Sequence, residues 1–205
     1  MDHLFYDLVE EIVAYLPRKD VETIARVADG RQGLEHWSAA AEGQLENRFL
    51  VDVTVVAGQT DDGVGINFLT IQKILSEGRR ESWNFLNWRF AWMRSVQIEA
   101  YPLLRQSTAD MNQVLRSISL PVDPSARGSL VFYLGPFVAD DRLIPFRYDS
   151  DPEVSRLAWK ILQAAQKDFP TVNIHQSAHI SHEAYDEFVN DFRQRGAFVE
   201  TLRHP

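Results

Sequence analysis

The first 48 residues repeat apolar positions with the period of an α-helix. Between positions 4 and 16 the apolar residues are spaced mostly three or four apart: Leu4, Leu8, Ile12, Tyr15 and Leu16, with Val9 and Val13 beside them. This spacing predicts an amphipathic helix that ends at Pro17, because proline cannot continue the helical hydrogen bonds. A second helix is expected from about Asp20 and a third over 34–48. Together they predict a small three-helix bundle.

From Phe49 onward the apolar period changes from near 3.6 to 2, which is typical of β-strands. Residues 49–56 predict one strand and 66–71 a second, joined by a hairpin turn at 60–63 in which Gly63 supplies a positive φ. Beyond this hairpin, strands and helices alternate. We expect strands at 96–100, 130–134, 172–175 and 198–202, and helices at 109–118, 152–168 and 182–195.

These patterns predict an α+β protein of two parts. The N-terminal three-helix bundle covers 1–48, and a β-hairpin followed by an irregular βα array covers 49–205. Alternation of strands and helices favours parallel strands joined by helical crossovers, as in a short leucine-rich-repeat-like array. The spacing between successive strands varies, so we expect the array to be irregular.

Composition and charge narrow the classes of function. Hydrophobic residues make up 45% of the 205 residues, enough for a packed core, and the formal net charge is −8. An acidic chain is a poor candidate for nucleic-acid binding, which needs a basic surface. The absence of cysteine excludes disulfides, thiol nucleophiles and cysteine-ligated zinc. The sequence has no apolar run of membrane-spanning length, so we expect an intracellular protein of the cytoplasm or nucleus with no membrane partner.

The N-terminal segment carries a resemblance to a known family. Residues 4–16 resemble the first helix of the F-box, and residues 17–21, Pro-Arg-Lys-Asp-Val, resemble its Pro-Lys-Asp-Leu connector. The next aliphatic positions match without a gap at Ile24, Ala25 and Val27. The Met-Asp start, the Trp-Ser-Ala-Ala-Ala-Glu segment at 37–42 and the β-hairpin after it resemble the expanded F-box-like families of nematodes. In those families a divergent recognition domain follows the F-box.

This resemblance implies an adaptor and not an enzyme. F-box proteins bind a Skp-type adaptor protein by a helix-in-groove contact and present a protein substrate to a Skp-cullin-F-box ubiquitin ligase. It implies no cofactor and no catalytic residue, and it places substrate recognition in 49–205. By position, the residues implied in adaptor binding are Leu4, Leu8, Ile12, Leu16, Pro17, Val21 and Ile24.

Two departures from the family pattern leave an alternative open. Phe5 stands where the family has proline, and residues 29–36 lengthen the path to Trp37. The alternative is a free-standing protein-interaction domain without a ligase role. A further alternative is that the first three helices are only the N-terminal cap of a βα domain.

Aromatic and arginine side chains, the types that dominate protein interfaces, are concentrated between positions 79 and 94. One interpretation places Trp88, Phe90 and Trp92 on the inner face of a strand, since they are spaced by two. The other interpretation is a partner-binding patch that comprises Trp83, Trp88, Trp92, Arg89 and Arg94. The sequence pattern allows a mixture of the two.

A chemical alternative rests on three histidines. His175, His179 and His182 have a spacing compatible with metal ligands on one helix, which would suit a metal-dependent hydrolase. The surrounding pattern instead predicts a strand that ends at His175 and a helix that begins near His182, which would separate the three rings. We therefore expect no metal site. The sequence also contains no phosphate-binding glycine motif.

Overall fold

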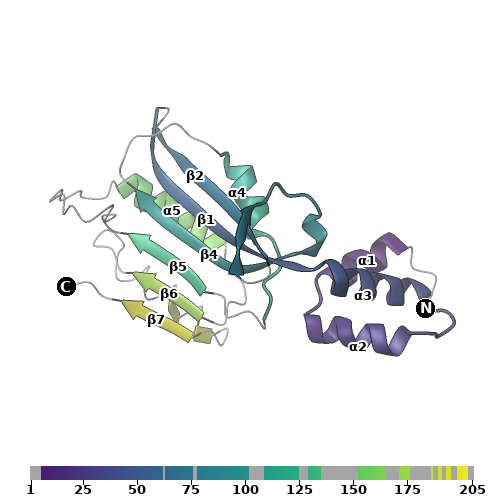
Figure 1. Ribbon diagram of the computed structural model, residues 1–205. Helices are drawn as coiled ribbons and strands as arrows, with labels where there is room; N and C mark the ends of the chain where they lie inside the picture. The colour runs from purple at the N-terminus through teal and green to yellow at the C-terminus, as the bar shows by residue number, and fades with distance from the viewer. Residues whose placement is uncertain are drawn as a thin grey trace.

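The computed structural model is a mixed α and β protein (Figure 1). It describes residues 6–61, 63–75, 78–101, 109–124, 129–134, 152–164 and 171–175, together with 186, 189–190, 193–194 and 198–202. The helices are α1 (Tyr6–Ala14), α2 (Arg18–Ala28), α3 (Glu35–Asn47), the 3₁₀ helix η2 (Trp88–Phe90), α4 (Met111–Ile118) and α5 (Pro152–Ala164). The strands are β1 (Phe49–Thr60), β2 (Gly63–Ile74), β3 (Arg80–Ser82), β4 (Ala91–Tyr101), β5 (Ser129–Leu134), β6 (Thr171–His175) and β7 (Phe198–Leu202).

Helices α1, α2 and α3 form a bundle with a core of its own. That core consists of Val9, Val13, Val21, Ala40 and Ala41. A second buried cluster lies between the sheet and its helices, and the two clusters share no residue. Figure 1 shows the bundle beside the end of the sheet where β1 begins. The division of the chain into domains at residue 48 stays a prediction.

The described strands form one seven-stranded sheet in the order β3-β2-β1-β4-β5-β6-β7. β1 and β2 make an antiparallel hairpin whose turn includes Gly63 at a φ of 118°, a backbone conformation that favours glycine. β1 pairs parallel with β4, and β4, β5, β6 and β7 follow as parallel neighbours. The expectation of parallel strands is therefore confirmed.

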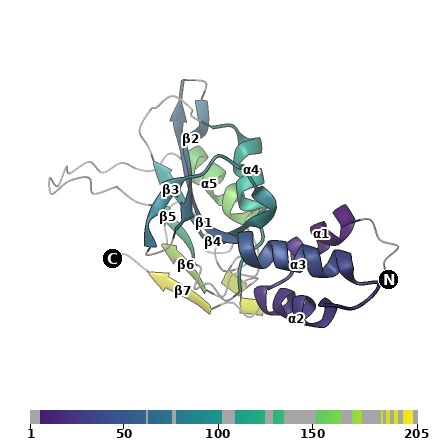
Figure 2. The same ribbon diagram turned by 45° about the vertical axis from the view of Figure 1, so that its right-hand side comes forward.

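One face of this sheet carries the main core. Val51, Val53 and Val55 of β1 point to the same side and pack with apolar residues of α4 and α5. Each step from β4 to β7 moves the chain to the next strand in one direction. Figures 1 and 2 show α4 and α5 on the same side of the sheet. Val189, between β6 and β7, belongs to the same core.

The opposite side of the sheet, the open face, carries polar side chains at paired positions of three strands. The register across β2, β1 and β4 brings together Asp52, Thr54, Thr70, Gln72, Ser95 and Gln97. Five of the six are half-buried, whereas Asp52 is only 8% exposed. This part of the open face is therefore polar and is built from residues far apart in the sequence, whereas the next pair along the strands, Val56 and Phe68, is apolar.

Most predicted elements are confirmed in type, and the first strands are longer than expected. The interpretation that Trp88, Phe90 and Trp92 share one strand is wrong. Residues 88–90 form η2, and β4 begins only at Ala91, because Asn87 adopts a left-handed φ of 58° and turns the chain. The predicted helix over 182–195 lies largely outside the described residues.

Candidate functional site

Helix α1 is apolar on two faces. Val9 and Val13 form its buried face, at 1% and 0% exposure. The second face consists of Leu8 and Ile12, and Tyr15 extends it in the turn directly after the helix; the three residues are 43%, 39% and 53% exposed, and we call them the α1 stripe. Residues at i, i+4 and i+7 lie on one side of a helix, so the stripe is continuous. Such an exposed apolar strip is typical of a surface that binds a partner.

The α1 stripe includes two of the residues implied in adaptor binding, Leu8 and Ile12, and both face solvent. Tyr15 completes the stripe but was not in the implied set. The signal for it was present in the sequence, since Tyr15 follows the same spacing as its two neighbours. Leu4 lies outside the described residues.

The remaining implied residues belong to the bundle itself. Val21 is fully buried in the bundle core, so its expected contact with a partner is corrected to a packing role. Leu16 and Ile24 are half-buried and pack against the same core, and Pro17 is half-buried at the start of α2. The helical period alone does not say which apolar face the neighbouring helices cover.

Helix η2, which directly precedes β4, contacts the bundle through Arg89. Its Nη1 lies 2.6 Å from Oε2 of Glu10 on α1. Its backbone carbonyl accepts a hydrogen bond of 3.0 Å from Nε2 of Gln44, a fully buried residue of α3. Arg89 is thus held by two helices of the bundle at once.

Arg48, directly after α3, makes a second contact between the two parts. Its guanidinium carbon lies 4.1 Å from the ring centroid of Trp92, and it donates to Oε1 of Gln44 over 3.3 Å. Burial lowers the pKa of Arg48 to about 10, so the side chain remains a cation at neutral pH. A cation over an aromatic ring is attracted by the ring's electron-rich face.

The tryptophans expected in a partner-binding patch have different surroundings. Trp88 is 52% exposed, which fits that expectation. Trp92 is 1% exposed at the start of β4, so its place in the patch is corrected to the core. Trp83 is half-buried with its ring in contact with Phe49 and Phe85 at centroid distances of 5.6 and 4.9 Å.

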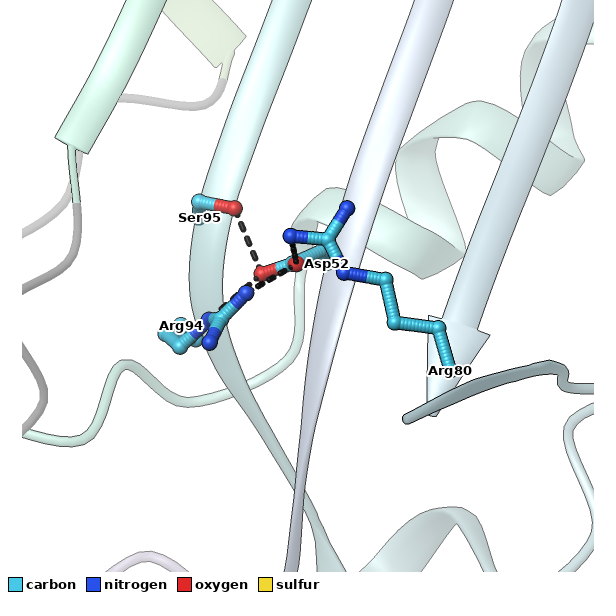
Figure 3. A network of polar contacts seen from close by, with 4 residues as sticks. All are labelled: Asp52, Arg80, Arg94 and Ser95. Atoms are coloured by element: carbon cyan, nitrogen blue, oxygen red, sulfur yellow. Dashed lines mark hydrogen bonds and ion pairs between the residues drawn. The ribbon is translucent and has the colours of Figure 1, made fainter. Parts of the chain in front are cut away.

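Arg94, which lies on β4 and belongs to the expected patch, forms hydrogen bonds within the chain. It donates from Nε to Oδ1 of Asp52 at 2.8 Å and from Nη2 to Oδ2 of the same carboxylate (Figure 3). Ser95 Oγ lies 2.6 Å from Oδ1, and Arg80 Nη2 of β3 lies 3.3 Å from Oδ2. The hydrogen bonds to Asp52 raise the pKa of Arg94 above its usual value. This network joins three strands on the open face.

A bulge in β4 makes this network possible. Val51 pairs with Met93 and Asp52 pairs with Ser95, so Arg94 is the extra residue in the parallel pair. The bulge places Ser95, which regular alternation would send to the core face with Met93, on the open face beside Arg94. Sequence alternation alone would place Arg94 and Ser95 on opposite faces, and the bulge that brings both to Asp52 is not visible in the sequence.

Of the three histidines in the metal-site hypothesis, His175 ends β6. His179 and His182 lie outside the described residues. Within the described part of the chain, no group of three or more histidine, aspartate or glutamate side chains is positioned to hold a metal ion.

Comparison with known proteins assigns no family. No protein-family model matches the chain, and no match is found among curated proteins or solved structures. Among the described helices, none combines the length and the apolar character needed to cross a membrane.

Proposed function

We propose that this chain is the substrate-recognition subunit of a Skp-cullin-F-box type ubiquitin ligase. In this proposal the α1–α3 bundle binds a Skp-type adaptor, and the sheet domain binds a protein substrate without catalysis or a cofactor. The observation that carries the proposal is the α1 stripe: Leu8, Ile12 and Tyr15 are each more than a third exposed although α1 already has a separate buried face.

The energetics of the stripe favour a partner. Burial of a large aliphatic or aromatic side chain contributes about 1.5–3 kcal/mol. The bundle leaves about half of this contribution unused at Leu8, Ile12 and Tyr15, which are 39–53% exposed. A groove on an adaptor protein would cover all three side chains at once, as amphipathic helices are bound in many complexes.

The sheet domain supports the recognition half of the proposal. The described parallel strands follow one another in chain order with α4 and α5 on one side of the sheet, which supports the proposal of a repeat-like recognition region. The open face then offers rows of polar side chains at regular spacing, as suits the binding of a folded protein surface.

Co-purification with a Skp-type adaptor tests the proposal. Ile12→Asp should weaken binding at least ~30-fold, because a carboxylate would be buried in an apolar contact. Leu115→Asp is the matched control: Leu115 is also mid-helix, on α4, and 42% exposed against 39% for Ile12. The control should bind like the wild-type chain. Equal binding by Ile12→Asp and wild type, or no binding by wild type, contradicts the proposal.

A free-standing interaction domain remains the second candidate. The segment between α2 and α3 favours it, since two residues there, Gly30 and Gly33, take positive φ angles of 64° and 83° and form a turn that the F-box pattern lacks. A wild-type bundle that is folded by circular dichroism but binds no Skp-type adaptor would support this candidate.

A further inference from the structure

A groove lies where the bundle meets the sheet domain. Two hollows of about 260 and 400 Å³ share three lining residues, Tyr15 directly after α1, Trp88 of η2 and Pro121 after α4. We call the combined hollow the Trp88 groove. Tyr15 and Trp88 are 53% and 52% exposed, so aromatic surface is open to solvent on both of its sides. Aromatic and arginine residues are the most frequent contributors to interface hot spots.

The walls of the Trp88 groove are held in place by hydrogen bonds. Trp88 precedes Arg89, which is tied to Glu10 and Gln44 of the bundle. Pro121 is held through its carbonyl, which accepts a hydrogen bond of 2.7 Å from the backbone N–H of Met93. A groove formed before binding reduces the ordering cost that a complex must overcome.

The loop before Trp88 has an unusual backbone. Phe85, which lines the larger hollow, has a φ of 64°, and Asn87 has a φ of 58°. The left-handed region is rare for an aromatic residue and costs roughly 1–2 kcal/mol. A hydrogen bond of 2.8 Å from Trp83 Nε1 to the Leu86 carbonyl holds the loop in this form. Such strain is often found where a loop presents side chains to a ligand.

Charge differs between the two ends of the groove. Asp7 and Glu11 line one end, where Glu10 is already paired with Arg89. Arg116 lines the other end, and its guanidinium forms no ion pair with the residues that the structure describes. A complementary occupant has an apolar side chain between a basic group at the α1 end and an acidic group at the Arg116 end.

We infer that the sheet domain supplies part of the adaptor-binding surface, through insertion of an apolar side chain of the Skp-type adaptor into the Trp88 groove. Tyr15 belongs both to the α1 stripe and to the groove, so one partner that covers the stripe continues onto Trp88. This inference rests on the proposed function. The inference adds to the proposed function the claim that adaptor binding needs residues outside the three helices.

Calorimetry of the full chain with a purified Skp-type adaptor tests the inference. Trp88→Ala should weaken binding about tenfold or more. Leu86→Ala is the matched control, because Leu86 lies in the same loop at 67% exposure and lines neither hollow. It should bind like wild type. Arg116→Glu, an exposed change, should also weaken binding and serves as a second variant if Trp88→Ala loses its fold.

The outcomes separate the two proposals. If wild type binds the adaptor and both Trp88→Ala and Arg116→Glu bind equally well, the inference fails while the proposed function stands. If wild type binds no adaptor, both fail. Light scattering of the chain alone provides a further check: a wild-type dimer that Trp88→Ala converts to monomer would show that a second copy occupies the groove, which also overturns the inference.

Discussion

Arg94 holds both carboxylate oxygens of Asp52 from a bulge in the neighbouring parallel strand, with a distance of 2.8 Å between Nε and Oδ1. The two residues are 42 positions apart in the chain. Arg80 approaches the same carboxylate from β3, so one negative charge is shared between two guanidinium groups. The network therefore ties β3, β1 and β4 together on the open face.

Asp52→Asn should destabilise the protein by about 1–2 kcal/mol, because two guanidinium groups lose their counter-charge. The expected loss is smaller than for a fully buried pair, since the Arg94 and Arg80 side chains are 32% and 52% exposed. Urea unfolding measures it. Glu22→Gln is the control: its pair with Arg18 is more than half exposed on both sides and should contribute less than ~0.5 kcal/mol. Equal losses in the two variants would refute the prediction.

Gln44→Ala should loosen the junction between the bundle and the sheet domain. It removes the donor to the Arg89 carbonyl and the acceptor for Arg48 in a part-buried site, at a cost of about 1–3 kcal/mol. Hydrogen exchange should become faster in η2 and at the end of α3. Asn47→Ala removes an exposed hydrogen bond that the Asn47 side-chain amide donates to the Gly43 carbonyl on the same helix. This variant should leave hydrogen exchange in η2 unchanged. Unchanged exchange in both variants would argue against this junction.

Two tryptophans four positions apart should differ in their effect on stability. Trp92→Ala should cost about 3–5 kcal/mol, because it empties a fully buried site. Trp88→Ala should cost less, about 1 kcal/mol, since half of this residue is already in solvent. Thermal unfolding of both variants provides the comparison. A large loss for Trp88→Ala would mean that the residue packs more tightly than its exposure indicates.

Neighbouring residues on α1 should separate packing from binding. Val13→Ala should destabilise the bundle by about 2 kcal/mol, through lost methyl groups and a cavity. Ile12→Ala should change the free energy of unfolding by less than ~0.5 kcal/mol but weaken adaptor binding. Chemical unfolding and adaptor titration of the same two variants measure both effects. Reversed stability effects would mean that the stripe, and not Val13, faces the bundle core.

Local sequence signals were sufficient for the helices and most strands. Pro17 and the change of period at Phe49 mark the ends of elements, and Gly63 marks the hairpin turn, because each acts through the backbone of a few adjacent residues. The alternation of strands and helices was also enough to predict parallel pairing.

Tertiary structure alone decided which of these surfaces are exposed. Both sides of α1 are apolar, so only the packing of α2 and α3 determines that Val13 is buried and Ile12 is not. The turn at Asn87 separates Trp88 from the core, and the bulge at Arg94 brings Ser95 to the same face as Asp52. The sequence by itself thus determined the elements and the resemblance of the first helices. The α1 stripe as a solvent-facing surface and the Trp88 groove depend on contacts between distant segments, which a local pattern does not encode.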